Sequence, residues 1–191
     1  VHLAPTADRP TASSNIITEK PQTVNARVWV VNQDNNSVNA FDAVTNAKIT
    51  EITVGTAPRT LAVAPNGRIW VTNKTSATIS VIDPSTRRVV QTISLPRASQ
   101  PFGVAFSPTG SAAFVTLGGT GRLLRLNPAT GSTQATINVG PNPRHVSVNA
   151  DGTLVYVSRF ITPLLPGEST GVLQTGTGGG EIVVVNAGRS T

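Results

Sequence analysis

The chain has no cysteine, little charge and few aromatic side chains among its 191 residues. The absence of cysteine excludes disulfides, zinc–thiolate sites, iron–sulfur clusters and covalent haem attachment within this chain. Charged residues make up 13% of the sequence and aromatic residues 4%, and the balance is made up by Thr, Ser, Asn, Gly and Pro. No apolar run approaches the roughly 20 residues that a membrane-spanning helix needs. The composition therefore predicts an all-β protein with short strands and many turns.

The 15 basic residues outnumber the 9 acidic residues and give a net charge of +6. They are scattered, and Arg87-Arg88 is the only adjacent pair. A nucleic-acid-binding domain concentrates its positive charge in a stripe or patch, so this distribution does not favour a nucleic-acid partner. It is typical of a scattered positive surface, and adhesion to an anionic polymer or cell surface remains the alternative.

Three stretches of the sequence share one pattern, a proline-led strand followed by a turn that closes on glycine. They are residues 57–67, 100–110 and 142–152. The closing residues Gly67, Gly110 and Gly152 stand 43 and then 42 residues apart. A period of roughly 40–45 residues carried by short strands is typical of a β-propeller blade. We therefore predict a β-propeller of four-stranded antiparallel blades, with about four blades forming a partial arc in this chain.

Three further strands are expected in each repeat. The second strand carries an aromatic residue that we expect to pack between adjacent blades: Trp29, Trp70, Phe114 or Tyr156. The third strand ends in a residue whose side chain can accept N–H groups of the following turn: Asp42, Asp83, Asn127 or Asn186. The fourth strand is expected at residues 48–54, 89–95 and 132–139. The aromatic and turn positions are thus interpreted as structural.

The run Trp70-Val71-Thr72-Asn73, followed by the strand 78–83 and by the proline-led strands ending in Gly, resembles the YVTN family of β-propeller repeats. The resemblance covers about residues 27–186. It implies a bacterial protein of the secreted or cell-surface type, and hence an extracytoplasmic location (periplasmic, secreted or cell surface). Some members of that family continue into a region that carries haem c, but the Cys-x-x-Cys-His attachment motif is absent here, so we expect no cofactor.

The strand count leaves the ring open. From Arg27 the pattern gives three strands, two complete blades and three more strands, which predicts blade units at about 25–56, 57–99, 100–140 and 141–191. Residues 1–24 are interpreted as a flexible leader or linker, with Asn15–Glu19 as a candidate closing strand. Three explanations remain open: a fragment whose remaining propeller blades lie elsewhere, a second copy that closes the ring, or strands supplied by residues 1–24.

Function in a propeller usually resides in loops at one end of the central channel. Two arginines at equivalent post-proline positions there can clamp a carboxylate, sulfate or phosphate group, or can instead hydrogen-bond carbonyls of the neighbouring blade. An inserted loop at 159–180 lengthens the last repeat on the same side, where it can dock a partner or seal a blade edge. The ligand-binding candidates are Arg59, Phe102, Arg144, His145, Arg159, Glu168, Asn32, Asn73 and Lys74.

No metal site and no catalytic residue are predicted, because histidine occurs only at His2 and His145 and no nucleophile elbow surrounds any serine. The sequence favours a non-catalytic scaffold or binding module for a protein or carbohydrate partner, within a larger extracytoplasmic protein. The alternative is a propeller lyase or hydrolase acting on an anionic polysaccharide or lactone. In that case His145 or Tyr156 would be the general base, and Arg144 would neutralise the substrate carboxylate.

Overall fold

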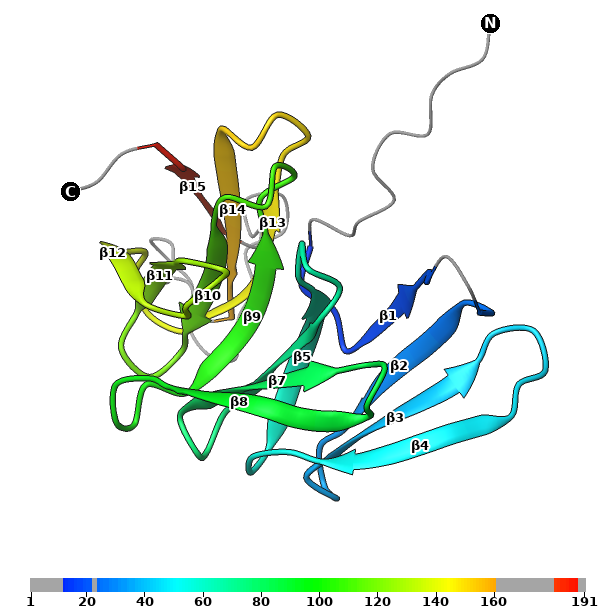
Figure 1. The fold of residues 1–191 in the computed structure, drawn as a ribbon. Helices are drawn as coiled ribbons and strands as arrows, with labels where there is room; N and C mark the ends of the chain where they lie inside the picture. The colour runs from blue at the N-terminus through cyan, green and yellow to red at the C-terminus, as the bar shows by residue number, and fades with distance from the viewer. Residues whose placement is uncertain (1–11, 22–23, 161–180, 189–191) are drawn as a thin grey trace, which may run out of the picture.

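The computed structural model describes residues 12–21, 24–160 and 181–188, which form fifteen strands in four antiparallel sheets. Within these residues no helix long and apolar enough to cross a membrane occurs. Consecutive strands are neighbours in each sheet, and the first strands of successive sheets lie against one another at the centre (Figure 1). The sheets are therefore four blades of a β-propeller, as the repeat predicted.

The strands of each blade have the following bounds. Blade 1 contains β1 (Ile16–Glu19), β2 (Arg27–Asn32), β3 (Ser37–Asp42) and β4 (Lys48–Thr53). Blade 2 contains β5 (Pro58–Val63), β6 (Ile69–Asn73), β7 (Thr78–Asp83) and β8 (Arg88–Ser94). Blade 3 contains β9 (Pro101–Phe106), β10 (Ala113–Leu117), β11 (Arg122–Leu126) and β12 (Thr133–Asn138). Blade 4 contains β13 (Pro143–Val148), β14 (Leu154–Arg159) and β15 (Ile182–Asn186).

The strands expected from Arg27 onward are all present, and one more precedes them. The fourth strands fall within one residue of the predicted bounds at each end. The additional strand β1 lies in the Asn15–Glu19 segment and pairs with β2 through Ile16↔Val30 and Glu19↔Arg27. Blade 1 thus has four strands, whereas the described part of blade 4 has three.

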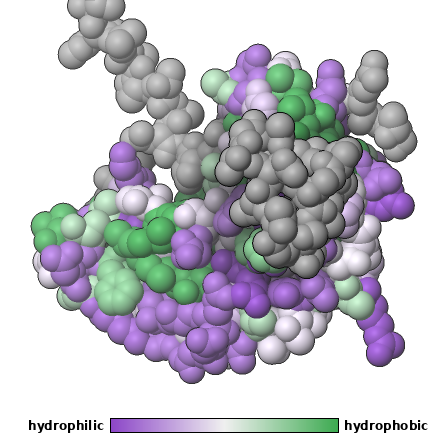
Figure 2. All heavy atoms as spheres, turned by 180° about the vertical axis from the view of Figure 1, so that it is seen from behind, coloured by the Kyte–Doolittle hydropathy of each residue, from purple (hydrophilic) through white to green (hydrophobic). Residues whose placement is uncertain are grey.

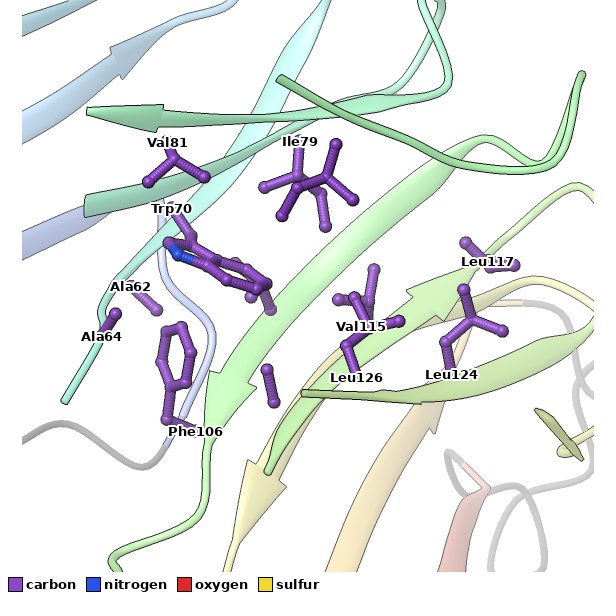
Figure 3. Close-up of a cluster of buried hydrophobic side chains, with 13 residues drawn as sticks. Ala62, Ala64, Trp70, Ile79, Val81, Phe106, Val115, Leu117, Leu124 and Leu126 are labelled. Carbon is purple, nitrogen blue, oxygen red and sulfur yellow. The ribbon is translucent and has the colours of Figure 1, made fainter. Parts of the chain in front are cut away.

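The hydrophobic core is divided into three clusters, each between two successive blades. Trp29, Trp70 and Phe114 are at most 2% exposed and belong to these clusters, as predicted. Figure 3 shows the cluster between blades 2 and 3, where Trp70 meets Phe106 edge to face with 5.1 Å between ring centroids. The prediction for Tyr156 was wrong: this side chain is 36% exposed, because no described blade packs on that face of blade 4.

The polar residue that ends each third strand caps the following turn, as predicted. Asp42 Oδ1 accepts the N–H groups of Val44 and Thr45 at 2.8 Å each. Asp83 and Asn127 each accept two N–H groups of the following turn in the same way, and Asn186 accepts one, that of Gly188. These bonds satisfy backbone donors that a tight turn would otherwise leave to water.

Two carboxyl groups of blade 1, one in such a turn and one on β4, make the fold sensitive to acid. Hydrogen bonds from the Thr45 N–H, from Asn25 and from the Val44 N–H lower the pKa of Asp42 to about 2. Hydrogen bonds from Lys48 and Ser37 lower the pKa of Glu51 to about 2. A carboxyl group with a depressed pKa stabilises the fold above its unfolded pKa, and this contribution is lost as the pH falls through the folded pKa.

We therefore expect the free energy of unfolding to stay level from pH 7 to about 5 and to fall between about pH 4 and pH 2. Urea unfolding at a series of pH values measures it. The Asp42→Asn variant keeps an oxygen that can accept the turn N–H groups but does not titrate there, so its pH dependence should be shallower. Identical slopes for the wild type and this variant would contradict the assignment to Asp42.

Candidate ligand-binding pocket

The proline-led strands β5, β9 and β13 begin in the same conformation. The residue before each proline has a positive φ of 54° at Ala57, 51° at Gln100 and 49° at Asn142. Each strand pairs with its neighbour at the proline and again three residues later, with a register shift in between. This irregularity takes the two residues after the proline out of the regular ladder, so their side chains are free for other contacts.

Buried hydroxyl groups fix the backbone at these post-proline positions. Thr72 Oγ1 on β6 donates to the carbonyl of Phe102, and Thr116 Oγ1 on β10 donates to the carbonyl of Arg144. Each hydroxyl also accepts an N–H from the first strand of its own blade, from Thr60 and Gly103 respectively. The threonine of the Trp-Val-Thr-Asn motif therefore joins blade 2 to blade 3, and Thr116 joins blade 3 to blade 4 in the same way. A hydroxyl residue recurs at this position of the second strand, as Thr72, Thr116 and Ser158. This recurrence was a sequence signal of the role, but the prediction did not use it.

A short N-terminal segment, residues 12–15, runs along the inner strands and is here called the strap. The Ser13 N–H donates to the Val146 carbonyl at 2.8 Å, and the Leu61 N–H donates to the Ser14 carbonyl at 2.8 Å. The strap thus joins blade 4 to blade 2 before the chain enters blade 1. Nothing in the repeat predicts it, because its contacts are mainly backbone hydrogen bonds.

The strap also replaces a missing side chain. In blade 2, Thr60 Oγ1 accepts the Val104 N–H of the next blade at 3.2 Å. The equivalent residue of blade 3 is Gly103, which has no side chain, and Ser13 Oγ accepts the Val146 N–H instead at 3.0 Å. Ser13 Oγ lies 3.1 Å from where a Cβ atom of Gly103 would be. A hydroxyl oxygen therefore accepts the N–H of the next blade in both cases, but at blade 3 it belongs to Ser13, which is distant in the sequence.

The strap and the post-proline residues line an open pocket of about 280 Å³. Its lining residues are Ser13, Ser14, Asn15, Gln33, Arg59, Thr60, Phe102 and His145. Three of the sequence-predicted candidates, Arg59, Phe102 and His145, are thus brought together. Phe102 and His145 meet edge to face with ring centroids 5.3 Å apart, and His145 Nδ1 lies 3.2 Å from Ser13 Oγ.

Arg144 lies beside the pocket and is held by two aromatic rings. Its Cζ atom is 4.7 Å from the centroid of Phe102 and 4.1 Å from that of Phe160. The positive guanidinium over the negative ring faces is a cation–π arrangement. It orients the side chain of Arg144 without neutralising its charge.

Three positively charged side chains lie near one another beside the pocket: Arg59, Lys74 and Arg144. Burial together with the positive charges of Arg59 and Arg144 lowers the pKa of Lys74. No described carboxylate forms a salt bridge with any of the three. Arg59 Nη1 donates to Gln33 Oε1, whereas its buried Nε has no partner among the described residues. The cluster therefore concentrates positive charge beside the pocket.

The remaining candidates lie elsewhere. The amides of Asn32 and Asn73 donate to serine and threonine hydroxyls of their own blades, and Asn73 is completely buried. Arg159 forms a salt bridge of 2.6 Å with Glu181, so its charge does not add to the cluster. Of the inserted loop predicted at 159–180, Arg159 is the last residue of β14, and residues 161–180, with Glu168, lie outside the described residues.

No protein-family model matches the chain, and no curated protein matches it. Hydrazine synthase of Kuenenia stuttgartiensis superposes with a TM-score of 0.72 at 21% identity, over 97% of this chain and 48% of that chain. A catalytically inactive virginiamycin B lyase from Staphylococcus aureus, solved with quinupristin, gives 0.63 at 17% identity, over 79% and 50%. A streptogramin B lyase gives 0.62 at 18% identity, over 79% and 49%.

These similarities define the class of protein. At identities of 16–21% the structural matches show the fold alone, and that fold is the β-propeller. The chain spans about half the length of the solved structures that it matches. The narrower resemblance to YVTN repeats stays a prediction.

Proposed function

We propose that the protein is a non-catalytic binding module whose pocket takes an anionic group, a carboxylate, sulfate or phosphate, of a ligand or partner. The observation that carries the proposal is the cluster of Arg59, Lys74 and Arg144, which has no described carboxylate as a counter-ion. Like charges held close together are destabilising, and a bound anion relieves their repulsion. Guanidinium groups also match the geometry of oxyanions through paired donors.

The surroundings of the cluster support a binding role. The backbone at Phe102 and Arg144 is fixed by the buried threonines, and cation–π contacts hold the Arg144 side chain. A site whose side chains are already ordered loses less conformational freedom when it binds. The proposal includes an extracytoplasmic location and a larger assembly, which rest on the resemblance to secreted and cell-surface propeller repeats.

Inorganic pyrophosphate is a suitable probe, because its two phosphate groups can engage two guanidinium groups at once. Isothermal titration calorimetry should show binding at low ionic strength that weakens in 0.5 M NaCl, since salt screens exposed charge. Arg59→Gln or Arg144→Gln should each weaken binding by about tenfold, as expected for loss of one charge-assisted hydrogen bond.

The matched control is Arg88→Gln, which removes the same charge from the exposed outer strand β8. This variant should bind pyrophosphate as tightly as the wild type. If all three variants lost affinity equally, binding would follow net charge and the pocket would not be a specific site.

The lyase alternative has one observation in its favour, since His145 and Arg59 line the same pocket. Tyr156 is not among the lining residues. A lyase would release an unsaturated product that absorbs in the ultraviolet from an anionic polysaccharide or lactone. Such a product, formed by the wild type and lost in His145→Ala, would contradict the non-catalytic role.

A further inference from the structure

The pocket beside the cation cluster is lined mainly by neutral polar side chains. Five of its eight lining residues carry a hydroxyl or a carboxamide group: Ser13, Ser14, Asn15, Gln33 and Thr60. A small inorganic anion would pair with Arg59 and leave these groups to water. In ligand pockets, a few placed polar groups fix the orientation of the ligand. The lining therefore indicates a ligand that offers hydrogen-bonding groups in addition to its charge.

Three of these five side chains are open to a ligand. The hydroxyls of Thr60 and Ser13 already serve the contacts between blades. The Ser14 hydroxyl accepts the Ile16 N–H at 3.2 Å, and no described group accepts its own proton. The side chain of Asn15 is exposed and makes no hydrogen bond with any described residue. The third open group is the amide of Gln33.

Gln33 and Arg59 contact each other, and this contact fixes the orientation of the Gln33 amide. Arg59 Nη1 donates to Gln33 Oε1. A guanidinium group can only donate, so Gln33 must present its carbonyl oxygen to Arg59, and its NH₂ group is left to donate to a ligand. An anionic group on Arg59 and a hydroxyl oxygen on Gln33 are then bound side by side. This arrangement matches a carboxylate carried by a hydroxylated carbon skeleton.

Two aromatic rings supply an apolar wall to the same pocket. Phe102 is half-buried and His145 is exposed, and their rings stand at 81° to each other. A six-membered sugar ring has hydroxyl groups around its edge and C–H groups on its faces. The C–H groups suit the negative face of an aromatic ring, while the hydroxyls reach the amides. The pocket therefore offers partners to both parts of a sugar.

Charge and volume narrow the ligand further. No described carboxylate forms a salt bridge with Arg59, Lys74 or Arg144, so the ammonium group of an amino acid would be repelled. The volume of about 280 Å³ lies just below the roughly 300–1,000 Å³ of pockets for drug-sized molecules, which matches one ring-sized unit.

Polar residues are common on this protein, but elsewhere they are spread out. Hydrophilic residues extend along the lower edge of the molecule in Figure 2, where β4 and β8 lie. These outer strands present exposed polar side chains in alternation along a convex rim. The pocket differs because it brings guanidinium, amide, hydroxyl and aromatic groups together at one point.

We propose that the pocket binds one acidic sugar unit, a six-membered ring that bears hydroxyl groups and a carboxylate. This inference rests on the proposed function and names the ligand class of the same site. The carboxylate pairs with Arg59, and ring hydroxyls bond to Gln33, Asn15 and Ser14. A C–H face of the ring packs on the aromatic wall.

Four small ligands test the proposal by NMR titration of the labelled protein at constant ionic strength. Glucuronate and galacturonate are the sugar acids. Cyclohexanecarboxylate keeps the ring and the charge but lacks the hydroxyls, and glucose keeps the hydroxyls but lacks the charge. At least one sugar acid should bind with a dissociation constant of about 1 mM, as expected for a ligand of this size. It should bind at least about tenfold more tightly than both cyclohexanecarboxylate and glucose.

A variant pair locates the hydroxyl contacts. Gln33→Met keeps the length of the side chain and removes the amide, so it should reduce the advantage of the sugar acid over cyclohexanecarboxylate by about tenfold. Gln134→Met is the matched control, because Gln134 is exposed on the outer strand β12, and it should leave that advantage unchanged. Equal effects of the two variants would overturn the assignment to the pocket.

Pyrophosphate is titrated into the same samples, so that the two proposals can fail separately. If pyrophosphate binds and neither sugar acid binds more tightly than cyclohexanecarboxylate, the sugar inference is overturned and the anion-binding pocket stands. Glucose that binds as tightly as the sugar acids would overturn it as well, because the charge would then play no part. If pyrophosphate does not bind, the proposed function itself fails.

Discussion

Replacing Trp70 by alanine is expected to lower the free energy of unfolding by about 3–5 kcal/mol, the usual cost of removing a large buried aromatic side chain. Trp70 is 2% exposed and lies in the cluster between blades 2 and 3, where it packs edge to face on Phe106. Its loss leaves a cavity at the interface of two blades, and the sheets on either side cannot collapse into it freely.

Urea unfolding monitored by circular dichroism measures this effect. Val90→Ala is the control, because it also shortens an apolar side chain but at a position that is 45% exposed. It should change the free energy of unfolding by less than about 0.5 kcal/mol. A loss below about 1 kcal/mol for Trp70→Ala would show that the contacts between blades contribute little to stability.

Replacing Gly103 by alanine is expected to damage both the fold and the pocket. An added Cβ atom would lie 2.5 Å from the carbonyl oxygen of Arg144 and 3.1 Å from Val146 Cγ1. The first of these is a backbone atom of β13, so relief requires β9 and β13 to move apart. Overpacking of this kind typically costs about 1–3 kcal/mol. Because Phe102 and Arg144 flank the contact, we also expect weaker binding of pyrophosphate by about tenfold.

Gly118→Ala is the matched control for this prediction. The nearest atom to its added Cβ is the carbonyl oxygen of Gln100 at 3.4 Å, an ordinary contact, and its φ is not in the left-handed region. Thermal unfolding and calorimetry of both variants compare the two sites. Equal effects at Gly103 and Gly118 would contradict a specific steric limit between blades 3 and 4.

The repeat made the blades predictable because each strand is specified locally. Alternating apolar residues and the Asp or Asn at the turn recur in every blade, and the proline-led start recurs in blades 2, 3 and 4, so register and turns follow from the pattern. The grouping of Arg59, Phe102 and His145 also followed, because the residues just after the prolines of successive blades converge on one axis.

What the sequence did not predict depends on neighbours rather than on local pattern. Tyr156 has the same sequence context as Trp70, and its exposure differs only because no described blade covers it. The strap was not predicted because its bonds to Val146 and Leu61 involve mostly backbone atoms, which carry no residue signature. The salt bridge between Arg159 and Glu181 spans the inserted loop, so no spacing rule indicates it.

The most direct test of the anion-binding pocket is an NMR titration that follows the Nε–Hε signals of the arginine side chains as pyrophosphate is added. Single Arg→Lys variants assign these signals. The account predicts that Arg59 and Arg144 shift together and saturably, while the exposed Arg88 does not shift. Small shifts of equal size at all three arginines would contradict it, because they would mean that pyrophosphate meets only the diffuse positive charge of the surface.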